Sequence, residues 1–161
     1  MITQEKLKEV LHYNPDTGIF TWLVQRGSNT KLGMQAGYID NGYIKIGIDY
    51  KYYKAHRLAF LYMTGKFPED QVDHIDTIRH HNWFSNLRKA TNRQNQENQR
   101  KAHKDNKSTG ILGVYPNRSG GFISQISINN KLKHLGSFRT IEEAHDAYIN
   151  AKRKLHEFNT L

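Results

Sequence analysis

The side chains best suited to chemistry lie between residues 71 and 99. Asp73 is followed directly by His74, and Asn82, Asn86 and Asn95 come further along the chain. A carboxylate is a hard oxygen ligand of the kind that binds magnesium or manganese. A neutral imidazole beside it can act as a base near pH 7, and an asparagine can hold one imidazole nitrogen by a hydrogen bond and leave the other free.

These residue types suffice for the hydrolysis of a phosphodiester bond. If Asp73 and a second oxygen ligand from a helix held one metal ion, His74 would activate water while the metal neutralised charge on the leaving oxygen. The same residues also have a plainer explanation, because an Asp next to a His in a polar stretch is common, and asparagine is frequent at turns. Spacing alone therefore leaves a catalytic site and a solvated polar stretch both open.

Composition narrows the class of protein. The 161 residues include 24 Lys or Arg and 15 Asp or Glu, which gives a net charge of +9. Basic domains attract polyanions, most often nucleic acid, and a merely soluble basic protein is the alternative. Cysteine is absent, which excludes a disulfide framework, a zinc-thiolate site and a cysteine nucleophile. Because neither a long apolar run nor a secretory leader is present, we expect a cytoplasmic protein with no membrane partner.

Local patterns predict the elements that position this polar group. Ile44, Ile46 and Ile48 alternate with other residues and predict a strand over 42–48. Residues 89–107 are polar and basic, and they predict a helix that ends in an exposed linker. The other elements predicted before residue 71 are a helix over 3–11, a turn over 14–18, a strand over 19–24, a return strand over 52–55 and a helix over 57–64 that ends at Gly65.

Residues 109–161 show a second pattern. Strands are predicted over 111–115, 122–129 and 131–135, with a tight turn at Asn129-Asn130. Thr140 and Glu143 form a capping-box pattern at the start of a helix. The stripe on that helix consists of Ala144, Ala147, Tyr148, Ala151 and Leu155. The pattern predicts a three-stranded antiparallel sheet packed on one helix, with the other sheet face polar and basic.

The first group of residues resembles a known motif. Residues 71–99 read QVDHID and later NWFSNLRKATNRQNQEN, and they closely resemble the HNH endonuclease motif, a two-stranded ribbon and a helix around one divalent metal. By this resemblance Asp73 is the first metal ligand, His74 the general base, Asn86 the residue that orients the base, and Asn95 the second metal ligand. Many members have His where this chain has Asn95, so phosphate oxygens are expected to complete the metal shell.

The resemblance extends toward the N-terminus. Residues 55–59 and the hairpin that begins at residue 42 resemble the N-terminal part of phage HNH homing endonucleases, so that the likeness covers nearly all of residues 4–99. Thr91 and Gln94 fit a capping box on the metal helix. Arg88 could contact phosphate or form an exposed salt bridge, and both roles stay open.

Residues 109–158 resemble the APETALA/ethylene-response-type DNA-binding domain, in which the sheet enters the major groove. The matching residues include GVY at 113–115, GF at 121–122, LGSF at 135–138 and TIEEAHDAY at 140–148. The positions that contact DNA in that family fall here on Tyr115, Asn117, Ser119, Gln125, Ser127, Leu132 and His134. Phosphate contacts beside that face would come from Arg118, Lys131 and Lys133.

Together these observations predict an α+β protein with a ββα-metal HNH nuclease domain over 1–100, a basic linker over 101–108 and an APETALA/ethylene-response-type domain over 109–161. The expected function is metal-dependent cleavage of double-stranded DNA, with one magnesium or manganese ion, in the manner of a phage homing endonuclease. A monomer is expected, with a dimer as the alternative, in the bacterial host cytoplasm if the protein is phage-encoded. The competing functions are a DNA-binding regulator with a decayed HNH site and a restriction or packaging nuclease.

Overall fold

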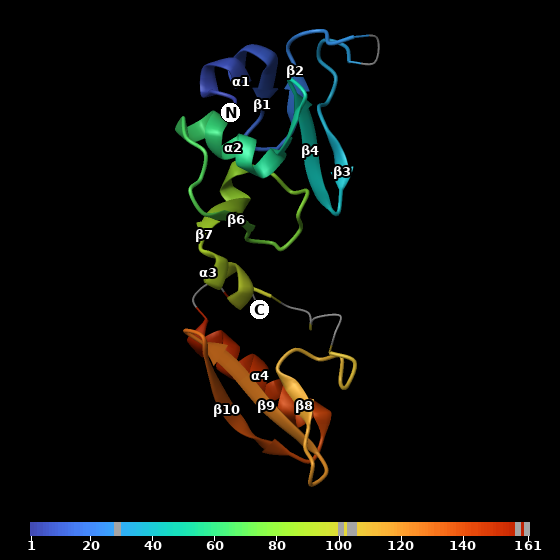
Figure 1. Cartoon of the computed structure of the whole chain (residues 1–161), viewed down its shortest axis with the longest axis vertical. Coiled ribbons are helices and arrows are strands. Elements are labelled where there is room, and N and C mark those ends of the chain that lie inside the picture. The colour runs from blue at the N-terminus through green and yellow to red at the C-terminus, as the bar shows by residue number, and fades with distance from the viewer. Residues whose placement is uncertain (28–29, 100–101, 103–105, 157–158, 160–161) are drawn as a thin grey trace. The chain divides into compact units, whose positions relative to one another are not determined.

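The computed structural model describes residues 1–27, 30–99, 102, 106–156 and 159 (Figure 1). These described residues form small antiparallel sheets and four α-helices. None of the helices in these ranges is long and apolar enough to cross a membrane. Two compact units, Met1–Ala90 and Thr91–Leu161, make up the chain and are described separately. The predicted linker over 101–108 lies partly outside the described residues, and the predicted domain limits stay a prediction.

The first unit begins with α1 (Gln4–Val10), and the Thr3 hydroxyl accepts a hydrogen bond from the Lys6 N–H at 3.2 Å. The chain then turns directly into β1 (Leu11–Tyr13), which pairs antiparallel with β2 (Phe20–Trp22). The sequence pattern predicts a helix that includes residue 11, and it predicts no strand there. The strand forms because Leu11 and Tyr13 are both buried while the residue between them is exposed, which is a period of two.

A three-stranded antiparallel sheet follows, in the order β3 (Tyr38–Asp40), β4 (Tyr43–Ile48) and β5 (Lys51–Lys54). Helix α2 (Ala55–Thr64) starts directly after β5 and ends at Gly65, which has a φ of 78°. The predicted alternation of β4 is present, since Ile46 and Ile48 are fully buried. The core that these elements share consists of Leu7, Val10, Leu11, Tyr13, Phe20, Trp22, Ala36, Ile46, Ile48, Ala55, Leu58, Ala59, Phe60, Leu61, Val72 and Leu87.

The first unit ends in a two-stranded ribbon that carries the polar residues of interest. Strand β6 (Gln71–His74) pairs antiparallel with β7 (Leu87–Ala90), which the one-turn 3-10 helix η1 (Phe84–Asn86) precedes. Val72 and Leu87 belong to the core of this unit. The ribbon is therefore fixed on the core through its apolar residues, while the chain between its strands forms a polar loop.

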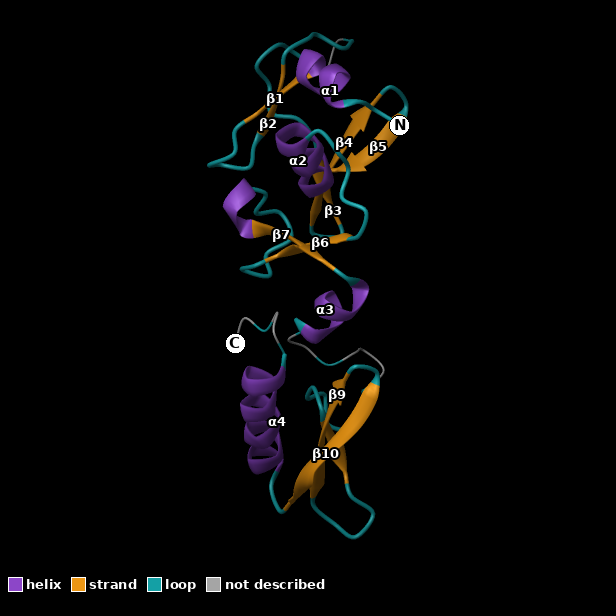
Figure 2. Cartoon of the chain, turned by 90° about the vertical axis from the view of Figure 1, so that its left-hand side faces the viewer, coloured by secondary structure: helices purple, strands orange, loops and turns teal. Residues whose placement is uncertain are grey.

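The second unit begins with α3 (Asn92–Glu97), a short helix with the predicted capping box between Thr91 and Gln94. Its sheet has the order β10-β9-β8, formed by β8 (Val114–Pro116), β9 (Phe122–Ile128) and β10 (Lys131–Phe138), and α4 (Ile141–Leu155) packs on it (Figure 2). Asn129 and Asn130 have φ of 52° and 61°, as the predicted tight turn requires.

Helix α4 buries two residues of the stripe that the sequence predicts, and Ala147 and Ala151 are half-buried. Ala144 and Tyr148 are buried, and Gly113 leaves no room for a Cβ against the Tyr148 ring. Leu155, however, is 41% exposed, and Lys152 is buried at the same end of the helix. The Lys152 ammonium donates to the Gln99 carbonyl. This hydrogen bond offsets part of the cost of burying a charged group at this end of the helix.

Candidate active site

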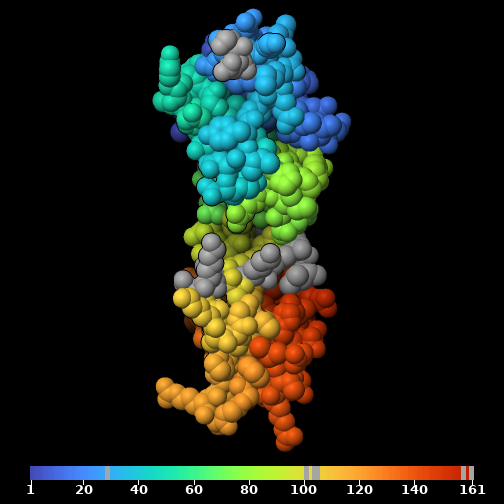
Figure 3. Space-filling view, turned by 90° about the vertical axis from the view of Figure 1, so that its right-hand side faces the viewer, coloured from blue at the N-terminus to red at the C-terminus, as the bar shows by residue number. Residues whose placement is uncertain are grey.

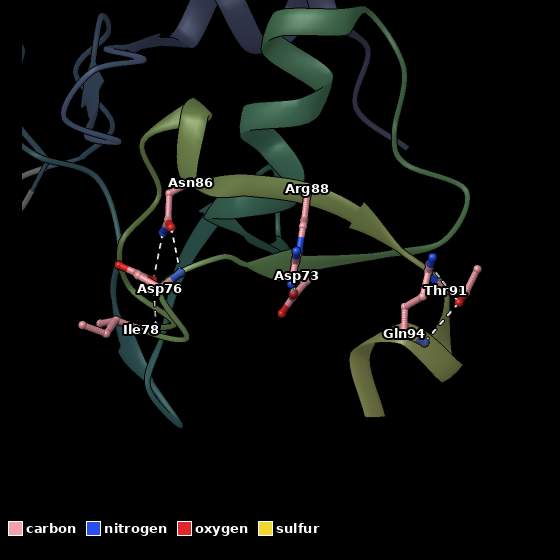
Figure 4. A network of polar contacts seen from close by, with 7 residues as sticks. All are labelled: Asp73, Asp76, Ile78, Asn86, Arg88, Thr91 and Gln94. Carbon is pink, nitrogen blue, oxygen red and sulfur yellow. Dashed lines mark hydrogen bonds and ion pairs between the residues drawn. The ribbon is translucent and has the colours of Figure 1, made fainter. Parts of the chain in front are cut away.

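The carboxylate of Asp73 lies in the middle of the β6–β7 ribbon and is 7% exposed. Because Asp73 stands directly opposite Arg88 in the ribbon, the Arg88 Nε and Nη2 both donate to the Asp73 Oδ2, at 2.9 and 2.8 Å (Figure 4). Arg88 thus forms a half-buried ion pair with Asp73 in place of the exposed salt bridge that the sequence left open, and its contact with phosphate stays a prediction.

His74 follows Asp73, and its side chain contacts a polar residue of the loop between β6 and β7. Its ring is 4% exposed, and its Nε2 lies 3.1 Å from the Asn82 Oδ1. Burial lowers the pKa of His74 below its usual value, although the hydrogen bond with Asn82 and the charges of Asp76 and Asp73 act in the opposite direction. The imidazole is therefore neutral at pH 7.

The amide of Asn82 also decides which imidazole nitrogen carries the proton. Its Nδ2 donates to the His80 carbonyl at 3.2 Å, which turns the Oδ1 toward His74. An amide oxygen only accepts, so the His74 Nε2 must be the protonated nitrogen. The lone pair is then on Nδ1, which makes no hydrogen bond to any residue in the described part of the chain. This is the nitrogen that can accept a proton from water.

Residues far away in the sequence hold Asn82 in place. The Tyr13 hydroxyl donates to the Asn82 carbonyl at 2.6 Å, and burial raises the pKa of Tyr13, so that this hydroxyl keeps its proton. Gly18, with a φ of 73°, packs so closely on the peptide between Asn82 and Trp83 that a Cβ would collide with it. Asn82 is itself only 2% exposed. The β1–β2 hairpin therefore positions the residue that orients His74.

Asn86 has a different set of contacts from the one predicted. Its Oδ1 accepts from the Asp76 N–H at 3.0 Å, and its Nδ2 donates to the Asp76 Oδ1 at 3.0 Å and to the His81 carbonyl at 2.9 Å (Figure 4). These bonds close the loop that contains Asn82, and none of them reaches the His74 ring. Asn82 makes the direct hydrogen bond with His74, whereas the family resemblance assigns this role to Asn86.

Asp76 is the acceptor at the centre of this loop. Burial acts to raise its pKa, but hydrogen bonds from the Ile78 N–H, from His81 and from Asn86 outweigh burial and lower it. The Asp76 Oδ2 lies 2.6 Å from the His81 Nδ1, and the Ile78 N–H donates to Oδ1 at 2.9 Å. His81 is thus engaged with Asp76, whereas the neighbouring His80 side chain is exposed.

His56, at the start of α2, packs against the candidate base and was not predicted to do so. Its ring centroid lies 5.1 Å from that of His74, with the two planes perpendicular, and 5.2 Å from that of Tyr43. Burial, and then repulsion from His74, lowers the pKa of His56 to about 3. Its Nδ1 is buried without a hydrogen-bond partner among the described residues. His56 is therefore a neutral ring at pH 7, packed against the ring of His74.

The two predicted metal ligands belong to different units. Asp73 lies on β6, and Asn95 lies on α3, where it is half-buried and its N–H donates to the Thr91 carbonyl at 3.0 Å. No three residues of His, Asp or Glu type gather at one point in the described ranges in a way that could hold a metal ion. A carboxylate and an amide oxygen are hard donors, and they suit magnesium or manganese, which keep several waters and use substrate phosphates as ligands.

The residues predicted to contact DNA in the second unit fall in three places. Gln125 and Ser127 stand opposite His134 and Leu132, so these four share one face of the sheet. Lys131 and Lys133 stand opposite Ile128 and Ile126, so they share the other face, although both lysines are exposed. The turn between β8 and β9 holds Asn117, Arg118 and Ser119.

Part of this predicted DNA-contacting face lines a hollow within the second unit. The hollow has a volume of about 300 Å³, and Tyr115, Gln125 and Ser127 contribute to it. Arg93 from α3 also lines it and donates to the Asn129 Oδ1 at 2.6 Å. The side of the sheet expected to be open therefore has α3 residues beside it.

A comparison with family models supports the assignment of the first group of residues. Residues 53–97 match the model described as HNH endonuclease, a stretch that contains α2, the β6–β7 ribbon and α3 and covers less than half of the chain. Residues 53–97 are thus similar to an HNH endonuclease domain. No curated protein and no solved structure matches the chain.

Proposed function

We propose that this protein is a metal-dependent endonuclease that hydrolyses phosphodiester bonds of double-stranded DNA. The observation that carries the proposal is the buried His74, held by Asn82 with its Nδ1 available as a base, next to the carboxylate of Asp73. Both residues lie inside the stretch that matches HNH endonucleases. Adjacent Asp and His in a solvated polar stretch would be exposed, whereas here both are buried.

In the proposed reaction, His74 takes a proton from the attacking water at Nδ1. The lowered pKa keeps the ring neutral at pH 7, which a base requires. The hydrogen bond from Nε2–H to the Asn82 Oδ1 fixes the orientation of the ring and stabilises the positive charge that develops on it. His56 packs its ring edge to face against that of His74, at 5.1 Å between the ring centroids.

Asp73 and Asn95 would hold one divalent ion, magnesium or manganese. The ion pair with Arg88 limits how the Asp73 carboxylate can turn. When bound, the metal would supply positive charge at the leaving oxygen. The roles of these residues rest on their motif positions and on donor chemistry.

The wider identity is proposed on the resemblance stated above. Nearly all of residues 4–99 resembles phage homing endonucleases. Residues 109–161 would serve as a docking module of the APETALA/ethylene-response type, and the protein would act in the host cytoplasm as a monomer. The three-stranded sheet with α4 and the basic charge of this region support the second module. In this arrangement the second module raises the effective concentration of the nuclease domain on its target.

The test is a cleavage assay on supercoiled DNA with magnesium, with manganese and with a chelator. We expect nicking or linearisation only with metal, and its loss in His74→Ala while duplex binding is retained. His12→Ala is the matched control, because this histidine of β1 is exposed and should leave cleavage unchanged. Binding without cleavage by the native chain would favour the decayed-site regulator, and cleavage retained by His74→Ala would remove His74 as the base.

A further inference from the structure

The outer face of the β3-β4-β5 sheet carries a row of aromatic and basic side chains. Tyr38 stands opposite Lys45, and Lys45 stands opposite Lys54, so the three share one face. Tyr43 and Tyr52 belong to the same face, because Tyr43 is two residues from Lys45 and Tyr52 is two residues from Lys54. We call these five residues the sheet face. The isoleucines of β4 point the other way, into the core.

Two tyrosines of the sheet face are exposed although they are large, and Tyr43 is half-buried. Tyr38 is 52% and Tyr52 is 63% exposed, and their rings meet edge to face at 6.4 Å. The Lys45 ammonium lies 5.1 Å from the centre of the Tyr52 ring. Cation–π contacts of this kind hold lysines above a flat aromatic surface, and basic residues interleaved with aromatic rings are typical of surfaces that bind nucleic acid.

The sheet face is continuous with the candidate base. The Tyr43 ring lies 6.2 Å from the His74 ring, and the Lys54 ammonium lies 4.1 Å from the centre of the Tyr43 ring. Arg79, from the loop after β6, places its guanidinium 5.1 Å from the same ring and donates to the Asn41 carbonyl at 3.5 Å. Figure 3 shows the cyan surface of β3 and β4 adjoining the light-green surface of the segment that follows β6.

The charge of this surface is positive. Lys45, Lys54 and Arg79 contribute three positive charges, and Asp40 contributes one negative charge, at 3.2 Å from Lys45. The hydrogen bond from Lys45 to Asp40 raises the pKa of Lys45, so that this lysine keeps its charge. A positive surface that adjoins the candidate base suits a chain of phosphates, because lysine and arginine neutralise phosphate charge.

We propose that the sheet face, together with Arg79, binds the phosphate backbone of duplex DNA beside the bond that is cut. This inference rests on the proposed function for the position of the cut, but not for the contact with DNA. It adds a DNA-binding surface in the first unit to the one expected in the second unit. The binding is independent of base sequence, because lysine and arginine contacts to phosphate carry no sequence information.

The experiment measures duplex binding against salt concentration, with the full chain carrying His74→Ala so that the DNA stays intact. The plot of log K against log salt has a negative slope. Lys45→Gln and Lys54→Gln together should make this slope less steep by about 1.8, or 0.9 for each lost phosphate contact. The factor by which the duplex affinity falls between 50 and 200 mM salt should therefore be about twelvefold smaller for the double variant than for the chain that carries His74→Ala alone. Lys8→Gln with Lys66→Gln is the control, since both lysines are exposed and lie outside the sheet face.

A second variant tests the contribution of the aromatic rings of the sheet face. Tyr52→Ala removes the ring beneath Lys45 and should weaken binding about two- to fivefold, the range of one exposed cation–π contact. Tyr52→Phe keeps the ring and should bind like the native chain. Equal melting temperatures of all variants would show that these changes act on binding and not on folding.

The outcomes separate this inference from the proposed function. An unchanged salt slope in the double-lysine variant, with metal-dependent cleavage by the native chain, overturns the sheet face and leaves the nuclease standing. A reduced slope without cleavage by the native chain supports the sheet face and rejects the catalytic role. If the lysine changes alter the sedimentation of the free protein and not its DNA binding, the face contacts a second copy of the chain, and the inference is wrong.

Discussion

His56 should make the first unit unusually sensitive to acid. Its pKa is about 3 in the folded chain, against 6.5 for an ordinary histidine. Between these values the unfolded chain binds one proton that the folded chain does not, so stability falls as the pH falls below 6.5. One pH unit corresponds to about 1.36 kcal/mol. At pH 4.5, two units below 6.5, His56 alone should therefore cost about 2.7 kcal/mol, a large part of the 5–15 kcal/mol that stabilises a typical domain.

The assay is urea unfolding of the native chain and of His56→Phe at several pH values from 7.5 to 4.5, followed by tryptophan fluorescence. Phenylalanine keeps a ring between His74 and Tyr43 but cannot take up a proton. We expect the native chain to lose about 2.7 kcal/mol more than His56→Phe over this range, while His12→Phe, a change at an exposed histidine, follows the native chain. Parallel pH profiles of the native chain and His56→Phe would refute the reasoning.

Three further outcomes follow from the site. Because burial lowers the pKa of His74, the neutral base persists below pH 6.5, so the acid limb of the cleavage rate should have its midpoint below 6.5; a midpoint above it would contradict the buried base. Asn82→Ala should lower kcat about 100-fold with little change in KM, and Asn82→Asp should move the acid limb to higher pH, because a carboxylate favours the charged imidazole. Gly18→Ala should cost about 1–3 kcal/mol in urea unfolding and also slow cleavage, whereas Gly33→Ala, at a similar φ of 78° with nothing near the new Cβ, should leave the rate unchanged.

Local signals in the sequence found the elements that carry the motif. The isoleucine alternation of β4, the left-handed Gly65 after α2 and the two capping boxes each depend on residues within a few positions of one another. The direct partner of His74 could not be found in this way. Asn82 lies in a loop with no periodicity, and its position depends on Tyr13 and Gly18, more than 60 residues earlier in the sequence. The same holds for His56, whose contact with His74 arises only when α2 packs on the ribbon.

The contacts of Asn82 also show which residues before the family match support the candidate site. The family match starts at residue 53, but the hydroxyl that holds the Asn82 carbonyl comes from Tyr13, and the close packing on its peptide comes from Gly18. The Phe84 N–H adds a third link, since it donates to the Pro15 carbonyl at 2.8 Å. Residues before the match thus position the base and supply much of the core.

A fragment that begins at residue 53 should therefore fail in a specific way. It loses the apolar residues of α1, β1 and β2 and cannot hold Asn82 against His74, so we expect neither cooperative unfolding nor cleavage. Tyr13→Phe in the full chain is the sharper version, because it keeps the ring in the core and removes only the hydroxyl that bonds Asn82. That variant should remain folded, with a reduced kcat and a nearly unchanged KM. Native kcat in Tyr13→Phe would show that the loop holds Asn82 without help from β1.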